Sequence, residues 1–203
     1  RWEAARFELA PVVRHLGDAT MEMPSVRTRV HIAAEEVPAL GYKTLRVVPQ
    51  EKATRLHGSL VTAHNMMENE FLRVEIELGG TLSILHRETG HQFSGLHSFQ
   101  DNGEAGVAWQ HVRPAYDRVI HDQDCQVTVS LIEDGPLLAA YRIDKLMRIP
   151  RCLMEGRGDE VRRLDANGDD SRRSEELVDM PITSVVTLRR GAKIVEITTR
   201  FEN

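Results

Sequence analysis

A two-residue hydrophobic period is the feature that most constrains how this chain folds. Over 71–78 the sequence FLRVEIEL alternates apolar and charged residues. Such alternation places one set of side chains on each face of a half-buried strand, whereas a helix repeats apolar positions at three and four residues. Similar windows occur at 26–32, 44–48, 126–132, 138–149, 182–188 and 193–201. The pattern therefore predicts strands along most of the chain.

Turn residues separate these windows. Gly79-Gly80 supplies the positive φ angles that a two-residue hairpin needs, and Arg190-Gly191 marks a second tight turn. Further turn sequences lie at 88–90 and 133–136. No stretch of twelve residues has helical periodicity. We therefore predict an all-β fold, a β-sandwich of roughly nine or ten strands.

Two segments break the alternation. Residues 100–117 combine Asp, Asn, Gly, Glu, Trp, His, Pro and Tyr and indicate a long functional loop or a crossover connection. Residues 151–179 are crowded with both signs of charge and indicate a mobile insertion. The pattern also lapses over 50–64. We therefore expect an N-terminal β-strand region over 1–50 and the main sandwich over 51–203.

Composition argues against several classes of function. The chain has 203 residues and a formal net charge of −5, which gives no attraction to nucleic-acid phosphates or anionic lipid. No apolar run approaches the roughly 18 residues of a membrane span. Cys125 and Cys152 form no CxxC motif, and we expect free thiols in the cytoplasm. Because the chain begins with Arg1, we interpret it as processed or as a piece of a longer protein.

No metal site is expected from the spacing of potential ligands. The nine histidines form neither a His-x-His pair nor an HExxH motif, so surface roles are favoured. Asp165, Asn167, Asp169 and Glu176 resemble a calcium loop. However, Asp170 stands where that loop requires glycine, so a solvated insertion is the better interpretation.

The carboxylates offer two kinds of candidate chemistry. Glu68 with Glu70, and Asp122 with Asp124, stand two residues apart and would share a strand face, usually at a solvated edge. No GxSxG nucleophile motif is present. The loop near Trp109 is more informative, because carboxylates and an aromatic face are the usual components of a sugar site. Its polar and aromatic residues are Asp101, Glu104, Trp109, His111 and Tyr116. The alternative is that Trp109 merely plugs one end of the sandwich.

The order of several segments carries a family resemblance. They span 37–49, 67–90, 99–109, 135–143 and 173–203. The most specific parts are Glu68-Asn69-Glu70, Gly80-Thr81 and the Asp-x-Gly-Glu-x-Gly-x-x-Trp loop at 101–109. In this order they resemble the C-terminal β region of glycoside hydrolase family 38 α-mannosidases.

The resemblance implies a galactose-mutarotase-like supersandwich, present only in part. In that family the zinc and the nucleophilic aspartate belong to an N-terminal α/β barrel, which a helical bundle follows. This chain has no His-x-Asp zinc motif, so we assign it no catalytic residue, metal ligand or cofactor, and expect zinc in the parent enzyme. Its expected partners are the barrel, the helical domains, a mannoside and further copies of the parent in a homo-oligomer.

The resemblance also implies a role for the loop at 101–109, because one loop of the β region reaches the sugar subsite in the family. The family often has Gly-Asp-x-Tyr where this chain has Gly106-Val107-Ala108-Trp109. We therefore predict Asp101, Glu104 and Trp109 as substrate-binding residues. The leading hypothesis is a non-catalytic β-sandwich portion of an α-mannosidase. The alternatives are a carbohydrate-binding module and an aldose-epimerase-like enzyme.

Overall fold

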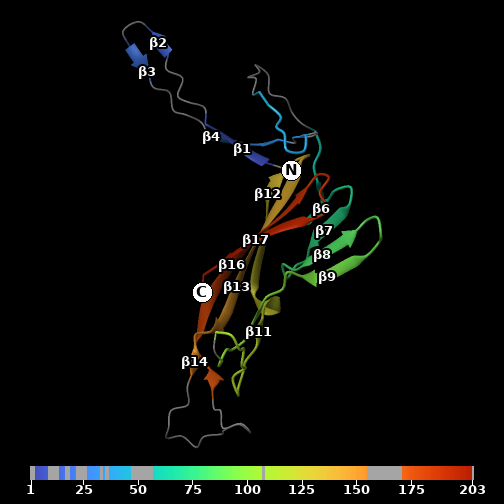
Figure 1. Cartoon of the computed structure of the whole chain (residues 1–203). Coiled ribbons are helices and arrows are strands. Elements are labelled where there is room, and N and C mark those ends of the chain that lie inside the picture. The colour runs from blue at the N-terminus through green and yellow to red at the C-terminus, as the bar shows by residue number, and fades with distance from the viewer. Residues whose placement is uncertain are drawn as a thin grey trace, which may run out of the picture. The chain divides into compact units, whose positions relative to one another are not determined.

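The structure, a computed structural model, consists of two compact units, Arg1–Leu56 and His57–Asn203. It describes residues 3–8, 14–16, 19–21, 27–32, 34, 37–46, 57–106, 108–154 and 171–202. Figure 1 labels the elements along the chain. The predicted assignment of 1–50 and 51–203 to separate domains stays a prediction.

The first unit contains two antiparallel strand pairs in its described part. Strand β1 (Glu3–Glu8) pairs with β4 (Arg27–Ile32), and β2 (Arg14–Leu16) pairs with β3 (Ala19–Met21). The strand predicted over 26–32 is thus confirmed as β4. The strand predicted over 44–48 is wrong for 44–46, which belong to no strand, and 47–48 lie outside the described residues.

The second unit begins with a five-stranded antiparallel meander in which neighbours in sequence are neighbours in the sheet. Its strands are β5 (Val61–Ala63), β6 (Met66–Glu68), β7 (Leu72–Ile76), β8 (Leu82–His86) and β9 (Gln92–Leu96). The predicted turn at Gly79-Gly80 joins β7 to β8, but only Gly80 of the two glycines has a positive φ, and residues 77–81 separate the strands instead of two residues. Figure 1 shows this meander in green beside the long strands that follow it.

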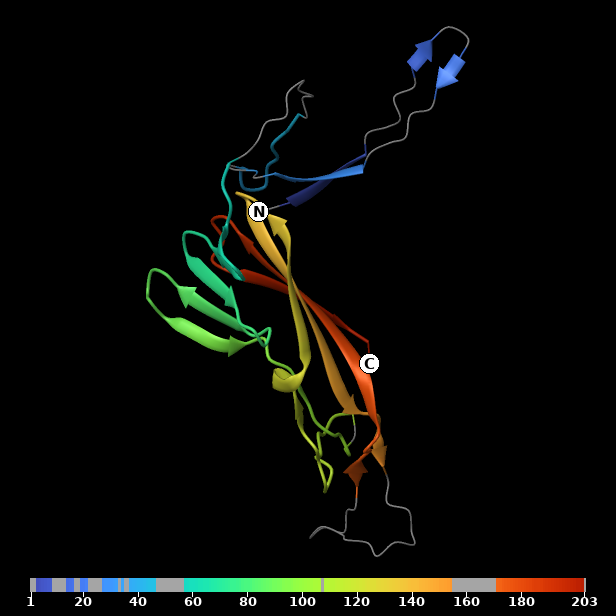
Figure 2. The ribbon, with the colours of Figure 1, turned by 180° about the vertical axis from the view of Figure 1, so that it is seen from behind.

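A four-stranded antiparallel sheet forms the second layer, in the order β12-β13-β16-β17. Its members are β12 (Gln126–Asp134), β13 (Leu138–Pro150), β16 (Leu177–Arg189) and β17 (Val195–Phe201). Two short pairs flank it: β10 (Gln100–Asp101) with β11 (Ile120–His121), and β14 (Leu153–Met154) with β15 (Arg172–Arg173). The single-turn 3₁₀ helix η1 (Asp122–Asp124) connects β11 to β12. Figure 2 shows the length and twist of the four-stranded sheet.

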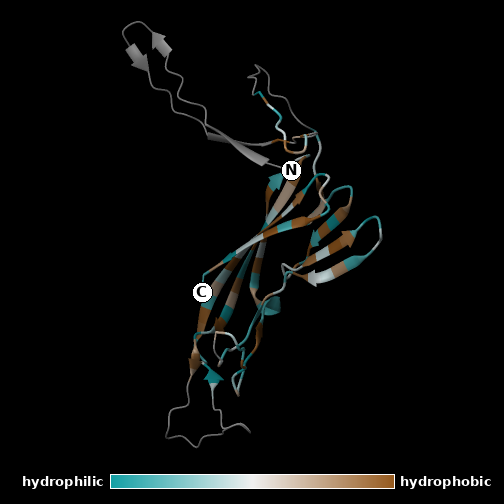
Figure 3. Ribbon diagram, viewed as in Figure 1, coloured by the Kyte–Doolittle hydropathy of each residue, from teal (hydrophilic) through white to brown (hydrophobic). Residues whose placement is uncertain are grey.

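The hydrophobic core lies between the two layers. Along β7, Leu72, Val74 and Ile76 are at most 5% exposed, whereas the intervening Arg73 and Glu75 are exposed. In the other layer, burial alternates over 141–147 of β13 and 182–188 of β16. Figure 3 shows hydrophobic (brown) and hydrophilic (teal) segments along both strands. The core also includes Leu82, Ala139, Tyr141, Ile143, Val186 and Leu188. The all-β sandwich prediction is confirmed.

Gly80 places the β7–β8 hairpin directly against the second layer. Its φ is +71°, and a Cβ atom there would lie 2.7 Å from Lys145 Cε and 2.9 Å from Ile143 Cγ2. Glycine is therefore required both for the turn and for the close approach of the two layers. The hairpin signal in the sequence thus also marks a packing contact.

The structure differs from the predicted mobile insertion over 151–179 at both ends. Residues 153–154 pair with 172–173, and β16 begins at Leu177 instead of the predicted 182. Residues 155–170 lie outside the described residues, so their predicted mobility is untested, as is the rejected calcium loop at 165–170. Cys125 and Cys152 are free thiols. No helix in the described part of the chain is long and apolar enough to cross a bilayer.

Candidate functional site

The candidate site is the connection between β10 and β11, which we call the Trp109 loop (residues 102–106 and 108–119). Its two stems are closed by the pairs Gln100–His121 and Asp101–Ile120. The Asp122 N–H also donates to the Phe99 carbonyl at 3.1 Å. The stems therefore close a long loop at its base. The loop predicted over 100–117 begins at residue 102, because Gln100 and Asp101 form β10.

Asp101, the first predicted binding residue, lies in the stem and is already paired. Its Oδ2 accepts a hydrogen bond from Arg173 Nη2, and the two side chains are 23% and 7% exposed. Nothing in the local sequence identifies Arg173 as the partner, because 72 residues separate the two positions. The carboxylate of Asp101 thus has a structural contact before any ligand is considered.

Glu104, the second predicted residue, organises the loop around its own carboxylate. Its Oε1 accepts hydrogen bonds from the N–H groups of Gly106 (2.6 Å) and Val112 (3.0 Å), and Oε2 contacts His111 Nδ1. Chiefly the Val112 N–H, then His111 and the Gly106 N–H, lower the pKa of Glu104 from 4.5 to about 2. The side chain is 49% exposed, so this anion is available to solvent.

Trp109, the third predicted residue, is the most exposed aromatic side chain of the loop, at 88%. Tyr116 is 47% and Val112 40% exposed. The alternative in which Trp109 plugs the sandwich end does not fit this exposure. The neighbouring Val107, which stands at the family's acidic position, lies outside the described residues.

A second polar cluster, which the sequence did not reveal, lies beneath the stems. Asp122 and Lys145 form an ion pair at 2.5 Å with side chains 2% and 1% exposed. His97 bonds Ser184 at 2.8 Å. Burial, and then the Lys145 charge, lower the pKa of His97, which the charge of Asp122 partly offsets. Since Lys145 also lies 5.4 Å from the Phe99 ring centroid, this cluster anchors the chain on both sides of the loop.

The carboxylate pairs predicted to share strand faces do not do so. Asp122 and Asp124 stand in the 3₁₀ helix η1, where Asp122 is buried and Asp124 exposed. Glu68 is the last residue of β6, and Glu70 follows the strand. Neither pair therefore provides an acid and a base facing one substrate.

Asn69, the centre of the Glu68-Asn69-Glu70 motif, is a structural junction. Its Nδ2 donates to the carbonyls of Arg189 (2.7 Å) and Ala192 (2.8 Å) in the β16–β17 turn. Its Oδ1 accepts from the N–H groups of Phe71 (2.9 Å) and Leu72 (2.8 Å). With the residue only 5% exposed, the amide ties the two layers together.

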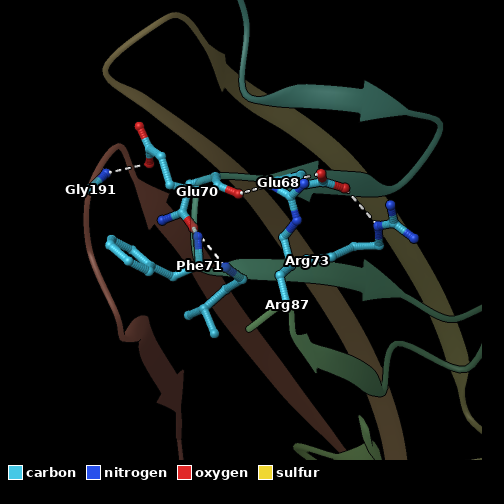
Figure 4. A network of polar contacts seen from close by, with 8 residues as sticks. Glu68, Glu70, Phe71, Arg73, Arg87 and Gly191 are labelled. Carbon is cyan, nitrogen blue, oxygen red and sulfur yellow. Dashed lines mark hydrogen bonds and ion pairs between the residues drawn. The ribbon is translucent and has the colours of Figure 1, made fainter. Parts of the chain in front are cut away.

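The two glutamates of the motif extend this junction outward, as Figure 4 shows. Glu68 forms ion pairs with Arg73 (2.6 Å) and Arg87 (3.1 Å). Glu70 accepts a 2.9 Å hydrogen bond from the Gly191 N–H. The N–H groups of Glu70 itself and of Gly191 lower the pKa of the Glu70 carboxyl. The motif thus supports the fold, because all three of its side chains already form contacts within the protein.

Two cavities lie beside described residues of the second unit, and the larger reaches Arg118 and Val119 of the Trp109 loop. One of about 820 Å³ is bordered by β11, η1 and the ends of β13 and β16, and includes His121, Asp124 and Cys125. A smaller one of about 510 Å³ lies beside Phe71 and Lys193. No three His, Cys, Asp or Glu side chains among the described residues are placed to hold a metal ion. This part of the chain therefore does not fit a zinc site.

The solved structures that share this fold include an α-mannosidase and a protein of glycosyl hydrolase family 38. An α-mannosidase from Enterococcus faecalis V583 matches 100% of the chain with a TM-score of 0.70 and 24% identity, over 23% of its own length. A family 38 glycosyl hydrolase from Enterococcus faecalis matches 98% at a TM-score of 0.68 and 24% identity, over 24% of its length. The chain thus shares the fold of one segment of these enzymes.

Comparison of sequences with curated proteins also finds a glycosidase relative. A putative mannosylglycerate hydrolase from Halalkalibacterium halodurans is 29% identical over 169 residues, which are 81% of this chain and 19% of the relative. No family model matches the chain. The chain therefore spans about a fifth of that relative's length. The predicted resemblance to family 38 α-mannosidases is confirmed, while the finer supersandwich assignment stays a prediction.

Proposed function

We propose that the chain is a non-catalytic β-sandwich portion of a glycosidase that hydrolyses α-mannosides. The observation that carries the proposal is the match over the whole chain to an α-mannosidase, at a TM-score of 0.70. The name of the curated relative, a mannosylglycerate hydrolase, supports the same class of substrate. Zinc and the nucleophile would belong to the rest of the parent enzyme, as the resemblance implies.

In this proposal the Trp109 loop forms one edge of the sugar site. The 88% exposure of Trp109 supports it, because an aromatic face packs against the apolar side of a sugar ring. The exposed carboxylate of Glu104 is placed to accept hydrogen bonds from sugar hydroxyls. Asp101 shares its carboxylate with Arg173, so its contribution combines sugar contact with support of the loop.

The decisive experiment begins with the complete reading frame that contains this chain. We expect a protein several times longer, with a His-x-Asp pair upstream of the present sequence. That protein should hydrolyse an aryl α-mannoside and lose the activity on treatment with a zinc chelator. The 203-residue chain alone should show no turnover. Zinc-dependent turnover by the chain alone would overturn the non-catalytic assignment.

A stand-alone carbohydrate-binding module is the second candidate, which the exposed Trp109 favours. Titration with mannose, followed by tryptophan fluorescence, separates the two. Saturable quenching with a Kd below about 1 mM (a binding free energy near −4 kcal/mol), lost in Trp109→Ala, supports the module. Quenching that does not saturate in that range supports the scaffold. An aldose-epimerase-like site gains no support from the Glu104–His111 pair, because that pair lies on an exposed loop.

Location and assembly belong to the same proposal. The free thiols of Cys125 and Cys152 support a reducing compartment, and hence the cytoplasm. The catalytic barrel and helical domains of the parent are the proposed partners, because the relatives are four to five times longer than their matched segments. The homo-oligomer of the parent stays a prediction.

A further inference from the structure

Arg173 lies at the point where β15 meets both ends of the Trp109 loop. Its side chain is only 7% exposed, although it belongs to a two-residue strand. A guanidinium so enclosed requires partners, because an unpaired buried charge is strongly unfavourable. Among the described residues, its side-chain partners are Asp101 in the first stem and Arg118 near the end of the loop.

The guanidinium bridges the start and the end of the loop. On the first stem, Arg173 donates to the Asp101 carboxylate and, at 3.4 Å, to the Asp101 carbonyl. At the other end of the loop, two residues before the second stem, Nη1 donates to the Arg118 carbonyl at 2.9 Å. The planar, forked shape of arginine allows one side chain to hold both ends of the loop at once, which a lysine ammonium cannot do in the same geometry.

The backbone beside Arg173 continues the same contact. The Tyr116 N–H donates to the Ser171 carbonyl at 3.1 Å, and Tyr116 forms a parallel bridge with Arg172. On the other half of the loop, a Cβ atom at Gly103 would lie 3.1 Å from Arg173 Cδ. Figures 1 and 2 both show the loop beside β14 and β15. Arg173 is therefore packed between the two halves of the loop.

The loop has little apolar packing with which to hold its shape. Trp109, Val112 and Tyr116 are all exposed, and Pro114 is its buried apolar residue among those described. Its conformation depends instead on polar contacts, among which the Arg173 bridge joins the two halves of the loop directly. Loss of that bridge should loosen the loop without opening the sandwich core.

We propose that Arg173 is a positioning residue that holds the Trp109 loop in one orientation and thereby sets where Trp109 meets a sugar. The first part of this proposal, that Arg173 controls the orientation of the loop, does not depend on the proposed function. The consequence for the sugar rests on the proposed function. Arg173 itself does not contact substrate in this proposal; it acts through Asp101 and Arg118.

Amide hydrogen exchange, measured by NMR on the full 203-residue chain, tests whether Arg173 controls the orientation of the loop. The loop probes are the amides of Gly103, Ala105 and Tyr116, which form hydrogen bonds within the loop or to its base. In Arg173→Met we expect their exchange to accelerate at least about tenfold, because local opening of the loop no longer has to break the contacts of Arg173. Amides of Ile143 and Val186 in the core strands should be unchanged. Arg173→Lys should fall between the two, and the exposed neighbour variant Arg172→Met is the matched control.

A second readout follows Trp109 itself. In a Trp2→Phe background Trp109 is the only tryptophan, since the chain has two. Its fluorescence anisotropy should fall in Arg173→Met and recover in part in Arg173→Lys. Should Arg173→Met fail to fold, Asp101→Asn removes the same ion pair at constant volume and should accelerate the same amides.

The proposal is overturned if the loop amides keep their wild-type exchange, or if core and loop amides accelerate equally. The sugar consequence has a separate test in the protein made from the complete reading frame, where Arg173→Met should raise KM for an α-mannoside more than it lowers kcat. If that protein has no mannosidase activity, the proposed function fails while the exchange result stands. If exchange changes but KM does not, the loop is positioned by Arg173 without serving the sugar site.

Discussion

The interior of the sandwich and the Trp109 loop use polar side chains in opposite ways. In the interior, Asn69 and the Asp122–Lys145 pair are enclosed, and their polar atoms are bonded across elements far apart in the sequence. In the loop, Glu104 bonds only residues within eight positions of itself and remains exposed. The interior contacts therefore specify the fold, whereas the loop contacts shape a surface.

This difference shows why a polar motif is a poor guide to function without its burial. Glu68-Asn69-Glu70 and the loop motif at 101–109 carry the family resemblance equally well in sequence. The loop leaves both an aromatic face and a carboxylate exposed. In the first motif Asn69 is buried between the layers and already bonded, while the Glu70 side chain beside it is 51% exposed.

The strongest test of this distinction is Lys145→Met. It leaves the Asp122 carboxylate buried without its counter-charge, and we expect a loss of about 3–5 kcal/mol in the free energy of unfolding. Urea unfolding followed by far-UV circular dichroism measures the loss. The double variant Lys145→Met/Asp122→Leu should recover most of it, because both charges are then absent. A loss below about 1 kcal/mol in the single variant would show that the pair is not enclosed as described.

The strands could be predicted where apolar and polar residues alternate along the sequence. The windows at 71–78, 126–132, 138–149, 182–188 and 193–201 became β7, β12, β13, β16 and β17. Burial alternates strictly along β7 and along 182–188 of β16, whereas five of the seven residues of β17 are exposed. Strand β9 escaped prediction because all five of its residues are exposed. The early start of β16 escaped because Pro181 interrupts the pattern. Pro181 lies where β17 pairing has ended, a position at which a strand tolerates proline.

The candidate site was predictable only as a set of exposed side chains. Trp109 and Glu104 stand in one short motif, and the family resemblance of that motif, beyond its composition, selected the loop. The residues that hold the loop come from distant strands: Arg173 lies 72 residues from Asp101, and Lys145 lies 23 from Asp122. Such pairs depend on strand register over the whole sheet, which no local pattern encodes.

Asn69→Ala tests the interior at a neutral side chain. It removes four hydrogen bonds and leaves the carbonyls of the β16–β17 turn without their donor, so we expect a loss of about 3 kcal/mol in the free energy of unfolding. Glu70→Gln is the control, because glutamine still accepts from the Gly191 N–H, and it should change stability by less than about 0.5 kcal/mol. Equal losses in the two variants would remove the distinction between the enclosed amide and its exposed neighbour.

The smallest effect is expected at Glu104, where titration should alter the loop alone. Because the folded-state pKa is about 2 and the ordinary value is 4.5, the carboxylate contacts should be complete above pH 4.5 and lost as the pH falls through about 2. The carboxyl ¹³C chemical shift of Glu104 measures this midpoint, with the urea-unfolded chain as the reference near 4.5. In His111→Asn the midpoint should rise yet stay below 4.5, since the Val112 and Gly106 N–H groups remain. A midpoint near 4.5 in the folded chain would mean that these N–H groups do not converge on Glu104, and the loop would then lack the order that a sugar contact requires.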